Sequence, residues 1–126
     1  MNKIYSITLD GNLIGTTQFE SADVPMGVLH GKILFENIDD PYSFIKSYCN
    51  KRSIGISHEE PKFKFIDTEI IPGLKVYNEN GNPLEGWGGT LTVFENQNEF
   101  EIQFAGVNSD TMKTQFPHHY RAYYKD

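Results

Sequence analysis

The amino-acid sequence predicts an α+β fold: a mainly antiparallel curved β-sheet or flattened barrel with one short α-helix packed on it. Aromatic residues are frequent, with nine Phe, seven Tyr and one Trp. They recur with Ile and Thr in short runs, which suits half-buried pleated surfaces. One stretch combines a helix start signal with apolar residues at helical spacing. Because the chain has 126 residues and no linker-like boundary, we expect residues 1–126 to form a single domain.

The first hairpin is predicted around Asp10-Gly11, a dipeptide that tolerates the positive φ angles of a tight turn. Residues 4–9 and 13–19 form its two strands. A two-residue loop would place Ile7 opposite Ile14, which gives the pair one largely apolar face.

A polar connection over residues 20–25 leads to the next predicted strand, which runs from residue 26 or 28 to residue 35. Gly27 and Gly31 interrupt this strand. Each of them marks a bulge or a close approach of backbone, rather than a loop that cradles a phosphate.

Asp40-Pro41 predicts the start of the helix, because aspartate caps a first turn and proline suits the first helical position. The apolar residues that follow share one face: Phe44, Ile45, Tyr48 and Cys49. Asn50 is the predicted end. Cys49 is the only cysteine, so no intramolecular disulfide can form. Its apolar setting predicts that it packs as a small hydrophobe and is not a nucleophile.

The middle of the chain predicts a polar loop over residues 53–61, followed by strand-like alternation over residues 62–70. A change of phase at Ile66 indicates a bulge in that strand. Residues 74–77 form another short strand. Residues 78–89 are polar and rich in glycine, and predict a long connection.

The clearest hairpin is the last one, in which residues 90–94 and 99–104 flank a turn at residues 95–98. The second of these strands alternates strictly between apolar and polar residues, so one of its faces is buried and the other solvated. Beyond it, residues 115–126 form either a final edge strand or a docked tail.

Charge and hydropathy restrict the classes of partner. Seventeen acidic and eleven basic side chains leave a net charge of −6, which opposes binding to phosphate backbones and to anionic lipid. No stretch approaches the roughly 20 apolar residues that span a bilayer, and residues 1–9 lack the apolar run of a signal peptide. We therefore expect a cytoplasmic protein that binds neither nucleic acid nor membranes.

No catalytic or cofactor motif is found in the sequence. The four histidines do not form a metal-binding pair at helical spacing, and no cysteine cluster accompanies them. Residues 55–59 lack the second glycine of a hydrolase nucleophile elbow, and residues 86–89 are not followed by the Lys-Ser or Lys-Thr of a phosphate-binding loop. The expectation is a protein that is not an enzyme and that uses no metal and no cofactor.

Two other groups of residues are also of interest. Glu99 and Glu101 share one sheet face, as an acid and base pair would, but they lie opposite a buried Phe/Ile face, so a solvated role is predicted. Trp87 stands among glycines, and both a core anchor and an exposed interface anchor are compatible with that setting.

Several segments together resemble small bacterial proteins that include immunity proteins of polymorphic toxin systems. The resemblance covers about residues 13–107 and transfers no catalytic residue. The segments that carry it are LIGTTQFE (13–20), DVPMGV (23–28), GKI (31–33), LKVY (74–77), NG (80–81) and FAGV (104–107).

The resemblance implies a toxin-neutralising protein that binds a toxin domain and occludes its active site. An acidic chain fits this role, because charge complementarity speeds the capture of a cationic toxin. The candidate partner-binding residues lie on predicted loops and combine an acidic rim with one aromatic anchor. They are Glu59, Glu60, Glu79, Glu85 and Trp87.

Two alternatives stay open. One is a small-ligand-binding protein or hydrolase with a site between sheet and helix, in which His30 is a candidate residue. The other is an accessory subunit that acts through an exposed strand edge. The sequence is compatible with a monomer and with an oligomer.

Overall fold

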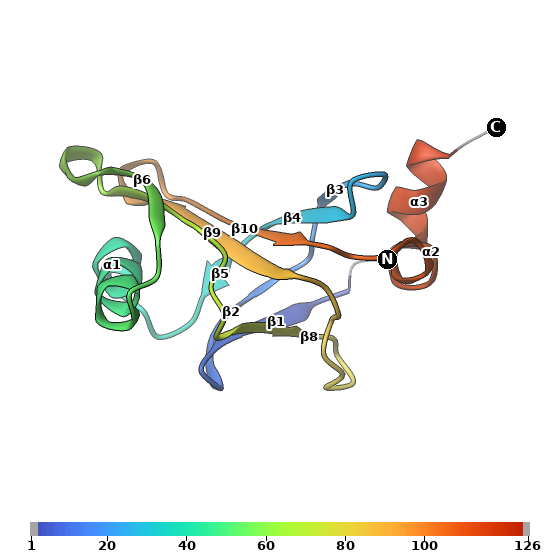
Figure 1. Cartoon of the computed structure of the whole chain (residues 1–126), viewed down its shortest axis with the longest axis horizontal. Coiled ribbons are helices and arrows are strands. Elements are labelled where there is room, and N and C mark those ends of the chain that lie inside the picture. The colour runs from blue at the N-terminus through green and yellow to red at the C-terminus, as the bar shows by residue number, and fades with distance from the viewer. Residues whose placement is uncertain (1–2, 125–126) are drawn as a thin grey trace.

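The computed structural model describes residues 3–124, which form two antiparallel sheets and three α-helices (Figure 1). The strands are β1 (Tyr5–Leu9), β2 (Asn12–Thr17), β3 (Ser21–Asp23), β4 (Val28–Lys32), β5 (Leu34–Phe35), β6 (Ile56–Glu60), β7 (Phe65–Thr68), β8 (Leu74–Tyr77), β9 (Gly88–Phe94) and β10 (Glu99–Ala105). The helices are α1 (Pro41–Arg52), α2 (Ser109–Gln115) and α3 (Pro117–Tyr123), with short 3₁₀ turns η1 (Pro61–Phe63) and η2 (Glu95–Gln97). The predicted α+β class is confirmed, but both sheets are open, so the barrel alternative is wrong.

The two sheets form a layered arrangement. One has the strand order β5-β2-β1-β8, and the other has the order β3-β4-β10-β9-β7-β6. Figure 1 shows the four-stranded sheet and α1 on the same side of the six-stranded sheet, with α2 and α3 at the opposite end from α1. Helix α1 packs against β7 and β9. The six-stranded sheet therefore has one covered face and one open face.

The buried side chains form one hydrophobic cluster. In β10, Ile102 and Phe104 are buried, whereas Glu99, Glu101 and Gln103 are exposed, so the predicted alternation is confirmed. Three aromatic rings pack together where β1 meets the residue that follows α2. The Tyr5 ring centre lies 5.3 Å from the ring centres of both Phe19 and Phe116. Phe116, which follows the last residue of α2, is therefore part of the core.

The β1–β2 hairpin is confirmed, with positive φ at both Asp10 and Gly11. Its predicted register is wrong. Ile7 pairs with Gly15 rather than Ile14, because the pairing shifts between Ile7 and Thr8. Such an irregularity adds a residue to one strand and moves every later pair by one position.

The strand predicted up to residue 35 is two strands in two different sheets. Lys32 pairs with β10, whereas Leu34 pairs with β2, so the chain crosses between the sheets at Ile33. Gly31 marks a close approach, because a β-carbon there would lie 2.0 Å from the Thr17 Oγ1 atom.

Helix α1 begins as predicted, since the Asp40 Oδ1 atom accepts a hydrogen bond from the Ser43 backbone N–H at 3.3 Å. It ends at Arg52 rather than Asn50. Cys49 is fully buried, as expected. None of the helices that the structure describes is long and apolar enough to cross a membrane.

Three other predictions need correction. Residues 56–60, predicted as a loop, form strand β6 because they pair with β7 at the edge of the sheet. Residues 62 and 63, predicted as the start of a strand, belong to η1, and the chain then turns at Lys64 with a positive φ. The single predicted helix is joined by two more, α2 and α3, and α3 lies within residues 115–126, where an edge strand or a docked tail was expected. Asn108 caps α2, and Pro117 suits the first turn of α3.

Candidate binding site

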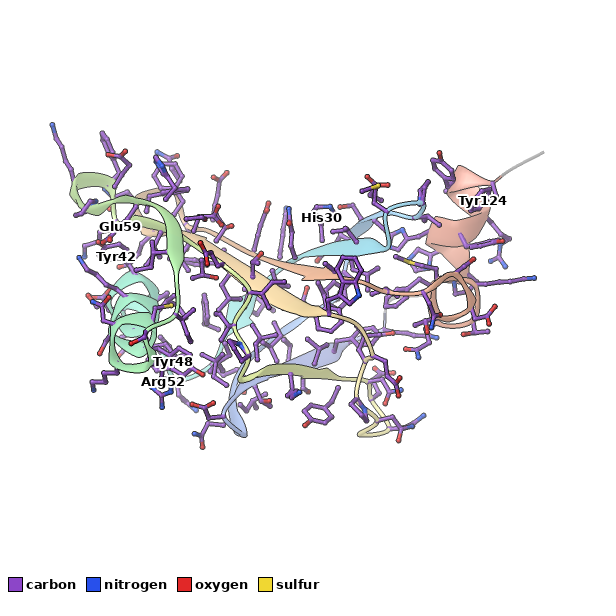
Figure 2. The ribbon with its side chains drawn as sticks, in the orientation of Figure 1. His30, Tyr42, Tyr48, Arg52, Glu59 and Tyr124 are labelled. Carbon is purple, nitrogen blue, oxygen red and sulfur yellow. The ribbon has the colours of Figure 1, made fainter. Side chains whose placement is uncertain are left out.

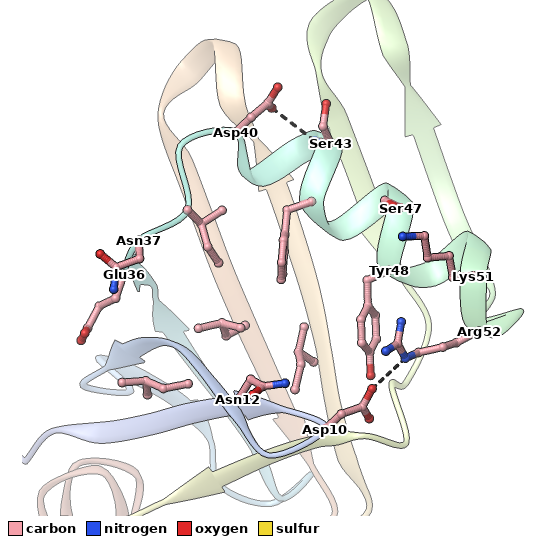
Figure 3. Close-up of a pocket in the computed structure, with 15 residues that line it drawn as sticks. Asp10, Asn12, Glu36, Asn37, Asp40, Ser43, Ser47, Tyr48, Lys51 and Arg52 are labelled. Carbon is pink, nitrogen blue, oxygen red and sulfur yellow. Dashed lines mark hydrogen bonds and ion pairs between the residues drawn. The ribbon is translucent and has the colours of Figure 1, made fainter.

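A cleft of about 730 Å³ lies between α1 and the β1–β2 hairpin (Figure 3). We call it the α1 cleft. One wall is a face of α1 that extends from its N-cap to its last turn, with residues spaced by three or four positions. These residues are Asp40, Ser43, Phe44, Ser47, Tyr48, Lys51 and Arg52. The apolar lining from the rest of the chain consists of Leu9, Leu13, Ile14 and Ile38.

The two ends of the α1 cleft carry opposite charges. Glu36 and Asp40 lie at the end where α1 begins, and Lys51 and Arg52 lie where it finishes (Figure 3). The Arg52 Nε atom donates a hydrogen bond to Asp10 Oδ2 at 2.7 Å. Among residues 3–124, Lys51 has no ion-pair partner. The lysine is thus the ammonium group at this end that remains open to a bound partner.

Tyr48 lies at the cationic end of the α1 cleft. The Arg52 guanidinium carbon is 4.1 Å from the centre of its ring. Within the described part of the chain, its buried hydroxyl has no hydrogen-bond partner of normal geometry. Burial raises the pKa of this hydroxyl, and the nearby Asp10 carboxylate raises it further. The hydroxyl therefore stays protonated at neutral pH.

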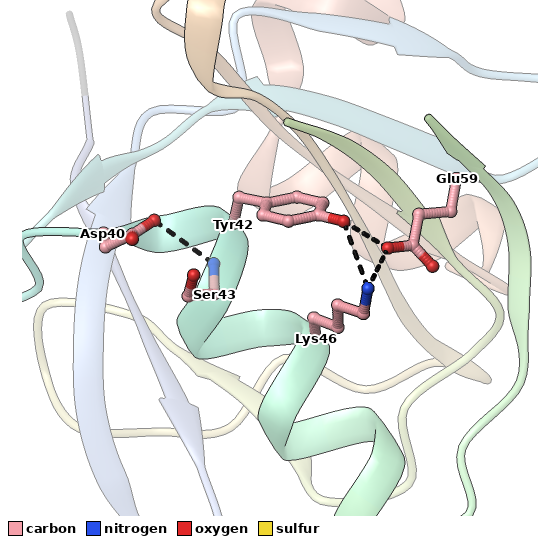
Figure 4. Close-up of polar contacts among 5 residues, drawn as sticks. All are labelled: Asp40, Tyr42, Ser43, Lys46 and Glu59. Atoms are coloured by element: carbon pink, nitrogen blue, oxygen red, sulfur yellow. Dashed lines mark hydrogen bonds and ion pairs between the residues drawn. The ribbon is translucent and has the colours of Figure 1, made fainter. Parts of the chain in front are cut away.

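Helix α1 is held in place by polar contacts with β6 (Figure 4). The Lys46 Nζ atom lies 2.8 Å from Glu59 Oε2, and the Tyr42 hydroxyl donates a hydrogen bond to the same carboxylate oxygen. These two donors lower the pKa of Glu59 below its ordinary value. Glu95 of η2 makes a further contact with α1, because its Oε1 atom accepts a hydrogen bond from the Tyr42 backbone N–H at 2.9 Å.

A second concave site of about 620 Å³ is lined by residues of two segments, 32–41 and 95–101. We call it the acidic groove. Its apolar floor includes Phe35 and Phe100, whose ring centres are 5.3 Å apart. Ile38 lines both the acidic groove and the α1 cleft, so the two sites are neighbours. Four carboxylates and one ammonium group line the acidic groove: Asp39, Glu95, Glu99, Glu101 and Lys32.

The five predicted partner-binding residues fall into two separate places. Glu59 and Glu60 lie on β6 rather than on a loop, and Glu59 is engaged with α1. Glu79, Glu85 and Trp87 lie on the connection between β8 and β9, at the other end of the fold from β6 (Figure 1). The structure therefore does not bring the five together into one surface.

Trp87 itself is 79% exposed, so the core-anchor alternative is wrong. Its backbone N–H donates to the Ala105 carbonyl oxygen at 2.8 Å. The ring lies so close to Gly106 that a β-carbon there would be 2.3 Å from Trp87 Cγ. Trp87 remains available as an exposed anchor on its own part of the surface.

His30 does not line the α1 cleft. Figure 2 shows it on the open face of the six-stranded sheet, where it pairs in register with Gln103 of β10. His30 therefore lies outside the cleft between sheet and helix. Across residues 3–124, no group of three His, Cys, Asp or Glu side chains is placed to hold a metal ion.

The α1 cleft lies between a sheet and a helix, the location given by one of the two alternatives from the sequence, but its lining residues were not predicted, and the acidic groove was not predicted at all. For the α1 cleft, a signal exists: Ser43, Ser47 and Lys51 repeat every four residues beside Phe44, which indicates a helix face that is not fully buried. For the acidic groove, Glu99 and Glu101 are solvated as predicted, but nothing local places Asp39 beside them.

The fold and these two sites define an α+β protein with two adjacent concave surfaces. One carries opposite charges at its two ends, and the other is mainly acidic. A scan against protein-family models found no match, and searches of curated proteins and of solved structures found none either.

Proposed function

We propose that this chain is a cytoplasmic, bacterial immunity-type protein that binds a cationic toxin domain and occludes its active site without catalysing a reaction. The acidic groove is the observation that supports this proposal most strongly. It surrounds an apolar floor with four carboxylates and one ammonium group. Lysine or arginine side chains of a partner would meet complementary charge at the rim and an aromatic surface beneath it.

The net charge of −6 acts in the same direction. An acidic surface attracts a cationic partner over distances of about 10 Å at ordinary ionic strength, and this attraction raises the association rate. Because Glu99 and Glu101 are exposed, they keep their hydration until the partner arrives. We therefore expect binding that is fast and sensitive to salt.

The test uses the purified product of the adjacent gene. Its affinity for this protein is measured by calorimetry at low and high salt, and protection is measured by co-expression in a sensitive host. The Glu99→Lys/Glu101→Lys double variant should weaken binding at least about 10-fold, since two attractive contacts become repulsive. The matched control, Glu79→Lys/Glu85→Lys, has the same charge change and should bind within about 3-fold of the wild type.

The outcomes are distinct. Loss of binding in the control pair, but not in the groove pair, would place the interface on the β8–β9 connection. Absence of both binding and protection would reject the immunity function.

A second candidate function is small-ligand binding or hydrolysis in the α1 cleft. The observation that favours it is the volume of about 730 Å³, which lies within the range of small-molecule sites. Native mass spectrometry of the protein purified from its own host tests it. A bound small molecule that a Ser47→Phe variant excludes would support this function over toxin binding.

A further inference from the structure

The α1 cleft has the dimensions of a site for another helix. The twelve residues of α1 make it about 18 Å long, and the residues that line the cleft cover that whole length. A helix of the same length and about 10 Å across occupies about 1,400 Å³. Half of that is close to the cleft volume of about 730 Å³. A helix embedded to half its depth would therefore fill the cleft.

The walls of the α1 cleft also suit a helix. Ser43 and Ser47 are small residues one turn apart on α1, and they let a neighbouring backbone approach closely. Leu13 and Phe44 flank this path and are 49% and 38% exposed, respectively. Exposed apolar side chains that line a concavity indicate a partner that covers them. An amphipathic helix offers such a cover, through apolar residues at every third or fourth position.

The charges at the two ends determine the direction of such a helix. Helices favour acidic residues in their first turn and basic residues in their last, because of the helix dipole. A helix antiparallel to α1 would place its acidic first turn at Lys51. Its basic last turn would then lie at Glu36 and Asp40, on the side where Ile38 borders the acidic groove. A parallel helix would meet like charges at both ends.

We propose that the α1 cleft binds an amphipathic helix of the partner protein, antiparallel to α1, with its apolar stripe on Leu13 and Phe44. The identity of that partner as a toxin rests on the proposed function, whereas the geometry of the site does not. A fatty-acid-like amphiphile with one charged head would use only one of the two charged ends. The helix uses both ends and the full length.

The probe is a synthetic amphipathic peptide of about 14 residues with leucines at positions i, i+3, i+4 and i+7, glutamates in the first turn and lysines in the last. A second peptide has the same composition with the charged ends exchanged. Fluorescence anisotropy measures both affinities for the full-length protein. We expect the first peptide to bind at least about 10-fold more tightly.

Protein variants locate the binding. The Glu36→Lys/Lys51→Glu variant should invert the preference between the two peptides. The matched control, Glu85→Lys/Lys75→Glu, makes the same exchange on the surface of residues 74–87 and should leave the preference unchanged. Leu13→Asp should abolish binding of both peptides. Because Leu13 is half exposed, this variant should keep the wild-type circular dichroism spectrum.

Equal affinities for the two peptides, or a preference that the charge exchange does not invert, would overturn the proposal. So would binding of decanoate that depends on Lys51 alone, with no peptide binding. Self-association that Leu13→Asp abolishes, again with no peptide binding, would assign the cleft to a second copy of the chain and also overturn it.

Two further outcomes distinguish the helix site from the proposed function. If the peptide preference holds but no toxin binds, the helix site is supported and the proposed function is rejected. If toxin binding is lost only in the acidic-groove variants and neither peptide binds, the proposed function is supported and the helix site is rejected.

Discussion

The His119 Nε2 atom lies 2.7 Å from the backbone carbonyl oxygen of Phe19. A carbonyl oxygen only accepts hydrogen bonds, so Nε2 carries the proton and donates. Phe19 is fully buried, with a φ of +48°, which is an unusual conformation for an aromatic residue. The bond thus connects α3 to a strained point between β2 and β3, and helps to hold both in place.

We expect His119→Ala to lower the free energy of unfolding by about 1–2 kcal/mol, because the Phe19 carbonyl loses its donor. Hydrogen exchange should also speed up across residues 109–123, since local contacts set the protection of such segments. His118→Ala is the control, because His118 is exposed and the structure gives it no hydrogen bond within residues 3–124. Equal effects of the two variants would contradict this account.

The contact between α1 and β6 predicts a pH dependence. Hydrogen bonds from Lys46 and Tyr42 hold the pKa of Glu59 below its ordinary value of 4.5. For a carboxyl with a lowered pKa, the stabilisation is complete above the unfolded pKa and is lost as the pH falls through the folded one. Glu59→Gln should therefore flatten the dependence of unfolding free energy on pH below 4.5. Urea denaturation across acidic pH measures it.

The control for this experiment is Glu60→Gln on the same strand. Glu60 is exposed, and its ion-pair contact is to His58, which is also exposed, rather than to α1. Its acid profile should follow that of the wild type more closely than the Glu59 variant does. A steeper acid profile in Glu59→Gln would mean that the carboxylate does not stabilise the contact.

Local signals in the sequence predicted the local features of this fold. Asp40 caps α1 and Pro41 fixes the φ of its first residue. Asp10-Gly11 forms the turn of the first hairpin. Neither of these features depends on distant residues. Strand β6 is different, because its polar sequence becomes a strand only through pairing with β7. The crossing at Ile33 likewise depends on which strands stand on either side of it.

The candidate sites were harder to predict for the same reason. The α1 cleft exists because α1 and the β1–β2 hairpin face each other, although Asp10 and Arg52 are 42 positions apart. The acidic groove gathers Asp39 and Glu99 from segments that no local pattern connects. Trp87 illustrates this limit, because its neighbours in sequence are compatible with both a buried and an exposed ring, whereas in the fold the ring is 79% exposed and lies beside Gly106 of a distant segment.

That exposure makes a prediction about Trp87. Trp87→Ala should change the free energy of unfolding by no more than about 0.5 kcal/mol, as is usual for surface positions. Phe116→Ala should cost about 3–5 kcal/mol, because Phe116 is 2% exposed and packs on Tyr5. Chemical denaturation measures both values. Free access of iodide to the single tryptophan would check the exposure independently, and a large loss of stability in Trp87→Ala would show that the ring is a core element.

The end of α1 offers a stabilising substitution. Ser53 follows the last turn with a φ of +55°, and its backbone N–H donates to the Cys49 carbonyl oxygen. A residue in the left-handed conformation terminates the helix here, and glycine is the usual residue at such positions because it has no β-carbon to clash with the backbone. We expect Ser53→Gly to raise the free energy of unfolding by about 0.5–1 kcal/mol. Glycine relieves the backbone strain of the left-handed conformation, and this gain is partly offset because glycine also gives the unfolded chain more conformational entropy. Ser53→Ala keeps the β-carbon and should be near neutral. Thermal and urea denaturation compare the three proteins, and a loss of stability in Ser53→Gly would imply that the serine side chain itself holds the helix end.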